Sequence, residues 1–91
     1  MNEIAKHIIF KGHVQGVGFR FTAHHIARGY DVTGFVRNVS DGTVEMHAQG
    51  PKQDVEGFLG EIQERMAGYI RQMQVETIPP AVGYTAFEIT F

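Results

Sequence analysis

Residues 12–20 read Gly-His-Val-Gln-Gly-Val-Gly-Phe-Arg, and they join a predicted strand to a predicted helix. Residues 3–11 alternate loosely between apolar and polar side chains, which is typical of a half-buried strand. Apolar residues then recur at helical spacing over residues 19–30, where Gly29 is placed to end the helix. The chain is therefore predicted to open with a strand, a glycine-rich loop and a helix.

Turn signals divide the rest of the chain into further elements. Asp41-Gly42 predicts a β-hairpin, and Gly50-Pro51 breaks a strand just before a helix. The predicted elements are strands over residues 32–39, 43–49 and 69–77, a helix with an apolar stripe over residues 55–66, and a final strand over residues 84–91.

The element order is β-α-β-β-α-β with an extra C-terminal strand as an option, which is typical of a ferredoxin-like α+β sandwich. Two helices are expected on one face of a mostly antiparallel sheet. The length of 91 residues predicts a single domain, residues 1–91. Because this fold hosts many functions, the function has to be argued from particular residues.

The composition argues against several classes of function. Eight basic and ten acidic residues give a net charge of −2, which is unfavourable for broad electrostatic binding of nucleic acid. The absence of cysteine excludes a thiol nucleophile, and the five histidines form no recognised metal-ligand spacing. No apolar run is long enough to span a membrane, and no signal peptide is evident. We therefore expect a cytoplasmic monomer with no nucleic-acid or membrane partner.

The glycine-rich loop is a candidate anion site. Gly12, Gly16 and Gly18 allow positive φ angles and a close approach of the backbone to a ligand. Several N–H groups at the start of a helix can point at one anion. Arg20 falls in the first turn of the helix, where its guanidinium group can hold two phosphate oxygens. The spacing by itself also fits a tight glycine turn beside a surface arginine.

Asn38 is the second candidate residue, near the end of the strand over residues 32–39. A parallel crossover from the first strand would bring the C-terminal ends of both strands to one edge of the sheet. Asn38 and the glycine loop would then share that edge. The Asn side chain offers a donor and an acceptor, which suits the orientation of a water molecule. The alternative is that Asn38 only shapes the following turn, to which we assign Asp41 and Gly42.

These two stretches together closely resemble the acylphosphatase family. Its first motif is represented by residues 12–20, as quoted above. The second is Gly34-Phe35-Val36-Arg37-Asn38, followed by Asp41-Gly42-Thr43-Val44-Glu45 and Gly50-Pro51, and the ending Phe87-Glu88-Ile89 is similar to the family's last strand. The likeness covers nearly the whole chain, and the predicted element order agrees with it.

The resemblance implies a hydrolase that cleaves the carboxyl–phosphate anhydride bond of acyl phosphates by direct attack of water. It carries the family's phosphate-binding arginine to Arg20 and the water-orienting asparagine to Asn38. The expected partners are an acyl phosphate substrate and inorganic phosphate, and no metal or cofactor is expected. The implied phosphate-binding residues are Gln15, Gly16, Val17, Gly18, Phe19 and Arg20.

Three other functions remain alternatives to a stand-alone enzyme. One is a carbamoyl-phosphate-handling module, like the one at the start of hydrogenase-maturation carbamoyltransferases. Another is a non-catalytic phosphate-binding module, which would need no Asn38. The third is an RNA-binding domain, but residues 43–49 lack the aromatic side chains that such sheets present to bases. We favour the stand-alone enzyme over the carbamoyl-phosphate module, because the chain ends soon after its last predicted strand.

Overall fold

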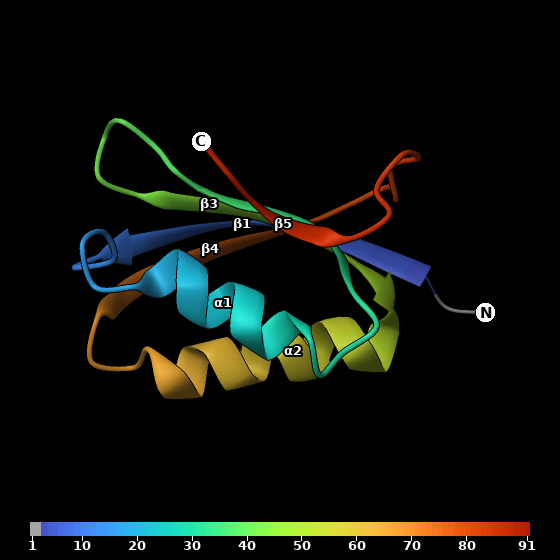
Figure 1. Ribbon diagram of the computed structural model, residues 1–91, viewed down its shortest axis with the longest axis horizontal. Coiled ribbons are helices and arrows are strands. Elements are labelled where there is room, and N and C mark those ends of the chain that lie inside the picture. The colour runs from blue at the N-terminus through green and yellow to red at the C-terminus, as the bar shows by residue number, and fades with distance from the viewer. Residues whose placement is uncertain (1–2) are drawn as a thin grey trace.

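Residues 3–91 are described by a computed structural model, in which they form five strands and two helices (Figure 1). Neither helix in this described part is long and apolar enough to cross a membrane. In chain order the elements are β1 (Glu3–Gly12), α1 (Phe19–Ala27), β2 (Thr33–Asn38), β3 (Val44–Pro51), α2 (Lys52–Arg65), β4 (Ile70–Ile78) and β5 (Phe87–Thr90).

The strands form one sheet in the order β4-β1-β3-β2-β5, and both helices cover the same face of it (Figure 1). β3 pairs antiparallel with both β1 and β2, so β1 and β2 run in the same direction. β4 is antiparallel to β1, whereas β5 is parallel to β2. The predicted ferredoxin-like α+β fold with an added C-terminal strand is therefore confirmed.

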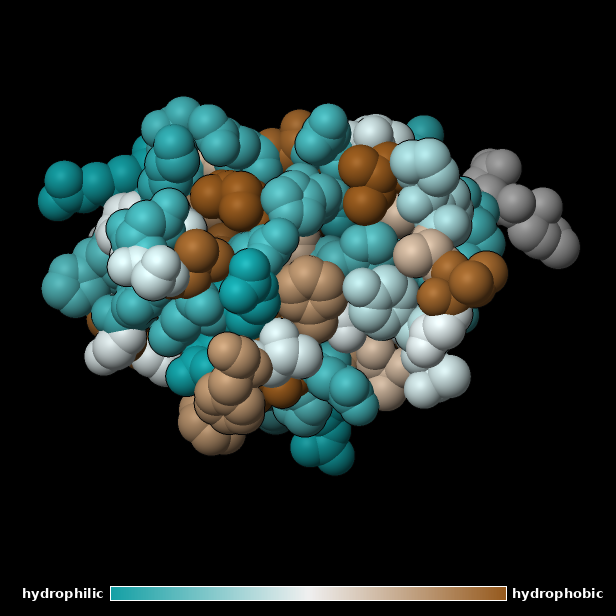
Figure 2. All heavy atoms as spheres, turned by 90° about the horizontal axis from the view of Figure 1, so that it is seen from above, coloured by the Kyte–Doolittle hydropathy of each residue, from teal (hydrophilic) through white to brown (hydrophobic). Residues whose placement is uncertain are grey.

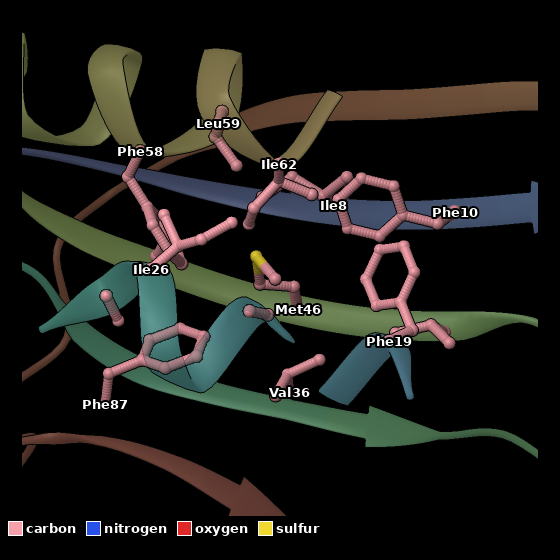
Figure 3. Packing of buried hydrophobic residues seen from close by; sticks show 14 of the residues in the cluster. Ile8, Phe10, Phe19, Ile26, Val36, Met46, Phe58, Leu59, Ile62 and Phe87 are labelled. Atoms are coloured by element: carbon pink, nitrogen blue, oxygen red, sulfur yellow. The ribbon is translucent and has the colours of Figure 1, made fainter. Parts of the chain in front are cut away.

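The hydrophobic core lies between the helices and the sheet (Figure 3). Side chains alternate along a strand, so every second residue of β1 and β3 faces this layer. Ile8, Phe10 and Met46 are completely buried there. The rings of Phe10 and Phe19 lie 4.8 Å apart, which joins β1 to the first turn of α1. This contact holds the two ends of the glycine loop together.

The first helix ends earlier than the apolar spacing predicts. The apolar spacing continues to Tyr30, but α1 ends at Ala27, two residues before Gly29, which the sequence predicted to end the helix. The N–H groups of Arg28 and Gly29 donate to the carbonyls of His25 and Ile26, three residues back, at 3.2 and 2.9 Å. Bonds of this shorter kind tighten the last turn of a helix and end its regular pattern. The chain can then turn towards β2.

The last strand is shorter than the predicted span of residues 84–91. β5 covers Phe87–Thr90 only, and the segment before it crosses the sheet face that carries no helix. There the ring of Tyr84 stacks on that of His47 at 4.7 Å. The side chain of Gln49 accepts a hydrogen bond from the N–H of Ala81 and donates one to its carbonyl. These contacts hold residues 81–84 against the face of the sheet, and the segment does not form a strand there.

This segment buries polar residues that strand alternation alone would leave exposed. His47 and Gln49 face away from the helices, yet they are only 5% and 8% exposed. The side chain of Gln49 also lies 2.8 Å from Nε2 of His47. Seen from this side, the molecule is mostly hydrophilic, with separate hydrophobic side chains among the polar ones (Figure 2). The sheet face opposite the helices is therefore partly covered, and the buried side chains of His47 and Gln49 are hydrogen-bonded there.

A charged network joins three strands on the same side of the sheet. Nε2 of His7 donates to Glu45 at 2.8 Å, and Nε of Arg37 donates to the other carboxylate oxygen of Glu45. The hydrogen bond from His7 and then that from Arg37 hold the pKa of the Glu45 carboxyl below its usual value, against the opposing effect of partial burial. The ionised carboxylate therefore contributes to the stability of the fold.

We expect Glu45→Gln to lower the free energy of unfolding by about 0.5–1 kcal/mol near neutral pH. A lowered folded-state pKa adds stability above the unfolded value of about 4.3, and this stability is lost as the pH falls through the folded-state pKa. The difference between variant and parent should therefore shrink in acid. Urea unfolding of both proteins at about pH 7 and about pH 3 measures it. An equal difference at both pH values would contradict the role of the ionised carboxylate.

Candidate active site

The loop between β1 and α1 exposes its backbone between buried anchor residues. Val14 and Phe19 are almost fully buried, at 1% and 2% exposure. Between them Gly16 and Gly18 are exposed and have φ angles of 78° and 76°, which side chains other than glycine rarely adopt. Gly18 directly precedes α1, whose first N–H groups have no partner within the helix. The loop can therefore present backbone donors to a ligand, as the sequence predicts.

The side chain of Gln15 ties this loop to the β2–β3 turn. Its Nε2 donates to the carbonyls of Val39 and Thr43, at 2.7 and 2.9 Å. The two segments lie far apart in sequence, and both are found at the same end of the sheet (Figure 1). Gln15 was expected to contribute its backbone amide. The structure adds a role for its side chain, which sets the distance between the loop and the end of β2.

We expect Gln15→Met to lower the free energy of unfolding by about 1–3 kcal/mol, because two carbonyls lose a donor in a partly buried place. Methionine keeps the length of the side chain but cannot donate. Urea unfolding of the variant and the parent gives the difference. Gln53→Met is the matched control, since Gln53 is exposed on α2. Equal losses in the two variants would show that the cost does not come from the loop–turn contact.

The turn after β2 is held by its own acidic residue. The carboxylate of Asp41 accepts hydrogen bonds from the hydroxyl and the N–H of Thr43, at 2.6 and 3.0 Å. These two bonds lower the pKa of the Asp41 carboxyl below its ordinary value. The N–H of Gly42 donates to the carbonyl of Val39 at 3.0 Å. Asp41 and Gly42 thus shape the turn, as expected.

Asn38 is the last residue of β2 and pairs with Val44 of β3. Alternation along β2 puts Asn38 on the same side as the buried Val36, which is the side covered by the helices. β1 and β2 run in the same direction, so the glycine loop leaves the sheet at the same edge as Asn38. The sequence predicted this shared edge without predicting contact.

The loop, the start of α1 and Asn38 enclose one cavity of about 270 Å³. The predicted residues that line it include Arg20 and Asn38, whereas Gln15 and Val17 do not line it. Val17 instead packs partly buried against the core. Val14 and Phe21 are lining residues that the sequence did not single out. The complete lining is Val14, Gly16, Gly18, Phe19, Arg20, Phe21 and Asn38.

Arg20 is the single charged residue of this lining. Within residues 3–91 no acidic side chain pairs with it, and its guanidinium carbon lies 5.0 Å from the centre of the Phe91 ring. This approach to an aromatic ring uses no hydrogen-bond donor, so the N–H groups of Arg20 stay available to an anion. One unneutralised cation beside exposed loop amides makes the cavity attractive to an anion of phosphate size.

Comparison with known proteins bears on what this cavity does. The acylphosphatase family model matches residues 6–89. The chain belongs to the acylphosphatase family. This membership confirms the family inferred from residues 12–20 and 34–38, and with it the expected class of enzyme, a hydrolase.

Curated relatives and solved structures agree with the membership. An acylphosphatase of Methanospirillum hungatei is 41% identical over 83 residues, 90% of this chain and 91% of that protein. One of Geobacillus thermodenitrificans is 45% identical over 71 residues, 77% and 76% of the two chains. The crystal structure of acylphosphatase from Bacillus subtilis matches 97% of this chain and 99% of its own, with a TM-score of 0.86 and 28% identity.

The same fold also occurs within a longer protein. The crystal structure of full-length HypF, in a phosphate- and nucleotide-bound form, matches 99% of this chain with a TM-score of 0.86 and 30% identity. The match covers 12% of the HypF chain. A domain of this fold thus also forms a small part of a larger protein.

Proposed function

We propose that this chain hydrolyses acyl phosphates to a carboxylate and inorganic phosphate, with the phosphate group bound in the cavity of Arg20 and Asn38. The observation that carries the proposal is that Arg20, in the first turn of α1, and Asn38, at the end of β2, line the same cavity as Gly16 and Gly18. Family membership supplies the class of reaction, and the cavity supplies a place for it.

The lining suits a doubly charged phosphate group. Arg20 offers a fork of N–H donors, and the loop between Gln15 and Phe19 offers backbone amides at the start of α1. No acidic side chain lines the cavity to oppose the anion. Positioning and charge stabilisation are the main needs of phosphoryl transfer, and these groups can meet both.

The attacking group in the proposed reaction is water. None of the lining residues carries a hydroxyl, thiol, imidazole or carboxyl group that could take the phosphoryl group covalently. The side-chain oxygen of Asn38 can accept a hydrogen bond from a water, and its amide can donate one. The water oxygen then bonds to phosphorus while the bond from phosphorus to the acyl oxygen breaks. A proton of the water passes to solvent or to the phosphate product.

The leaving group needs no help from an acid. The acyl oxygen departs with the electron pair as a carboxylate, whose conjugate acid has a pKa of about 4. It is therefore a stable anion at neutral pH without protonation. This chemistry agrees with a lining in which Arg20 and Asn38 are the only side chains with hydrogen-bonding groups.

The test is hydrolysis of acetyl phosphate by the purified protein in the presence of a chelator. We expect turnover, together with competitive inhibition by inorganic phosphate. Carbamoyl phosphate is measured in parallel, because a carbamoyl-phosphate-handling module is the alternative within the family. A folded protein that binds phosphate but hydrolyses neither compound would be a non-catalytic phosphate-binding module instead. The monomeric state and the cytoplasmic location stay predictions of the sequence.

A further inference from the structure

A second, smaller cavity adjoins the proposed phosphate site. Its volume is about 120 Å³, and it is lined by Arg20, Phe21, Ile89 and Phe91. Arg20 and Phe21 belong to the linings of both cavities, so the two meet along the first turn of α1. The other two residues come from the far end of the chain, which β5 brings next to α1 by pairing with β2.

The lining of the second cavity is apolar apart from Arg20. Phe21 is 77% exposed and Phe91 is 97% exposed, while Ile89 is partly buried against the core. Large apolar side chains gathered at the surface beside a polar site are characteristic of a ligand-binding surface. The guanidinium carbon of Arg20 lies over the Phe91 ring, 5.0 Å from its centre, so the apolar lining of the second cavity adjoins the charged group of the phosphate site.

We propose that Phe21, Ile89 and Phe91 bind the acyl group of the substrate, and that the protein prefers apolar acyl groups, aromatic ones above all. The proposal rests on the proposed hydrolysis of acyl phosphates. In such a compound a single oxygen separates phosphorus from the acyl carbon. With the phosphate beside Arg20, the acyl group must therefore lie in a space next to that residue.

The size and the chemistry of the second cavity select among acyl groups. Apolar cavities of about 150 Å³ accommodate a benzene ring, so a half-open space of 120 Å³ can hold most of one. An acetyl group would fill only part of the surface. The phosphate group of the substrate engages Arg20, the one charged residue of this lining, so an acyl group with a further charge would lose hydration against Phe21 and Phe91 without a second charged partner. The cavity therefore favours a flat apolar group.

The experiment compares kcat/KM for benzoyl phosphate and acetyl phosphate in the parent and in Phe21→Ser and Phe91→Ser. We expect the benzoyl-to-acetyl ratio to fall by about tenfold in each variant, the low end of what one methylene contributes in a closed apolar pocket. The loss should appear mainly in KM for benzoyl phosphate, because an acyl contact is made before and during reaction. Comparison of ratios cancels the different intrinsic reactivities of the two compounds.

Val82→Ser is the matched control, because Val82 is 99% exposed and lies on the connector between β4 and β5, outside both linings. Its ratio should equal that of the parent. Phe91→Leu separates the contact of Phe91 with the acyl group from its contact with Arg20, since leucine keeps an apolar surface but has no aromatic ring for the guanidinium group. We expect the benzoyl-to-acetyl ratio of this variant to stay close to that of the parent.

Two outcomes distinguish the failure of this inference from the failure of the proposed function. If acetyl phosphate is hydrolysed but the ratio is the same in the parent and in both serine variants, the acyl site is wrong and the hydrolase stands. The acyl site is also wrong if Phe91→Ser lowers kcat/KM equally for benzoyl phosphate and acetyl phosphate and weakens inhibition by phosphate. Phe91 would then only position Arg20. If the folded parent hydrolyses neither compound, both proposals fail.

Discussion

Arg20→Ala is expected to abolish the binding of inorganic phosphate and to lower acetyl phosphate turnover by about 10³–10⁵, the range found for an arginine that stabilises phosphoryl transfer. Arg20 is the one charged residue in the lining of the proposed phosphate site, and no other cation can replace it there. Its side chain is half-buried at the surface, so its truncation should leave the core intact. Steady-state kinetics and phosphate inhibition measure the two losses.

Arg28→Ala is the control for the loss of a positive charge. Arg28 is exposed at the other end of the same helix, where it caps α1 with its backbone. We expect this variant to keep both phosphate binding and turnover. Arg20→Lys adds a further comparison, because lysine keeps the charge but lacks the planar fork that holds two oxygens at once. An Arg20→Ala protein that binds phosphate as well as the parent would place the anion elsewhere.

Asn38→Ala is expected to keep phosphate binding and to lose about 10²–10³ in turnover, the scale measured for the removal of one oriented hydrogen-bonding group in an active site. Asn38 holds no charge, so its loss should hardly change the affinity for an anion. Its proposed role is to orient the water that attacks phosphorus, which affects kcat. The pair of measurements is therefore kcat for acetyl phosphate and the inhibition constant of phosphate.

Ser40→Ala provides the comparison within the same turn. Ser40 is exposed two residues after Asn38 and lies outside the lining. We expect parent-like kinetics from it, and urea unfolding of both variants checks that the β2–β3 turn is intact. Normal turnover in a folded Asn38→Ala protein would restrict Asn38 to shaping the turn. A loss of phosphate binding together with turnover would instead make Asn38 part of the anion site.

Much of the fold follows from local patterns in the chain. The period of the apolar residues predicts each strand and both helices, because a buried face repeats every second residue in a strand and about every 3.6 in a helix. The Asp41-Gly42 pair marks a turn for reasons of backbone geometry alone. Gly50-Pro51 was predicted to break the third strand, but β3 continues through both residues, which pair with Ile4 and Glu3 of β1, and α2 begins directly after Pro51. The direction of β2 relative to β1 follows from the helix between them. These features together predict that the glycine loop and Asn38 share an edge.

The ends of the elements were less predictable. The apolar spacing of α1 continues to Tyr30, but the helix closes at Ala27 through shorter backbone hydrogen bonds. The alternation around Tyr84 suggests a strand, but that ring stacks on His47 instead. At the end of α1 the competing bonds are local, between backbone groups three residues apart, whereas at Tyr84 the competing contact comes from a residue far away in the sequence.

The sequence by itself determined the order of the elements, the glycine loop and the two residues proposed to act on the phosphate. Only the tertiary structure showed that the Gln15 side chain ties the loop to the turn, and that Phe91 lies over Arg20. It also showed that residues 81–84 bury His47 and Gln49. Each of these contacts joins residues at least 24 positions apart, as in the pair Gln15 and Val39. The period of the apolar residues indicates which side of a helix or strand is buried. Which distant residue that side contacts depends on how the whole chain packs.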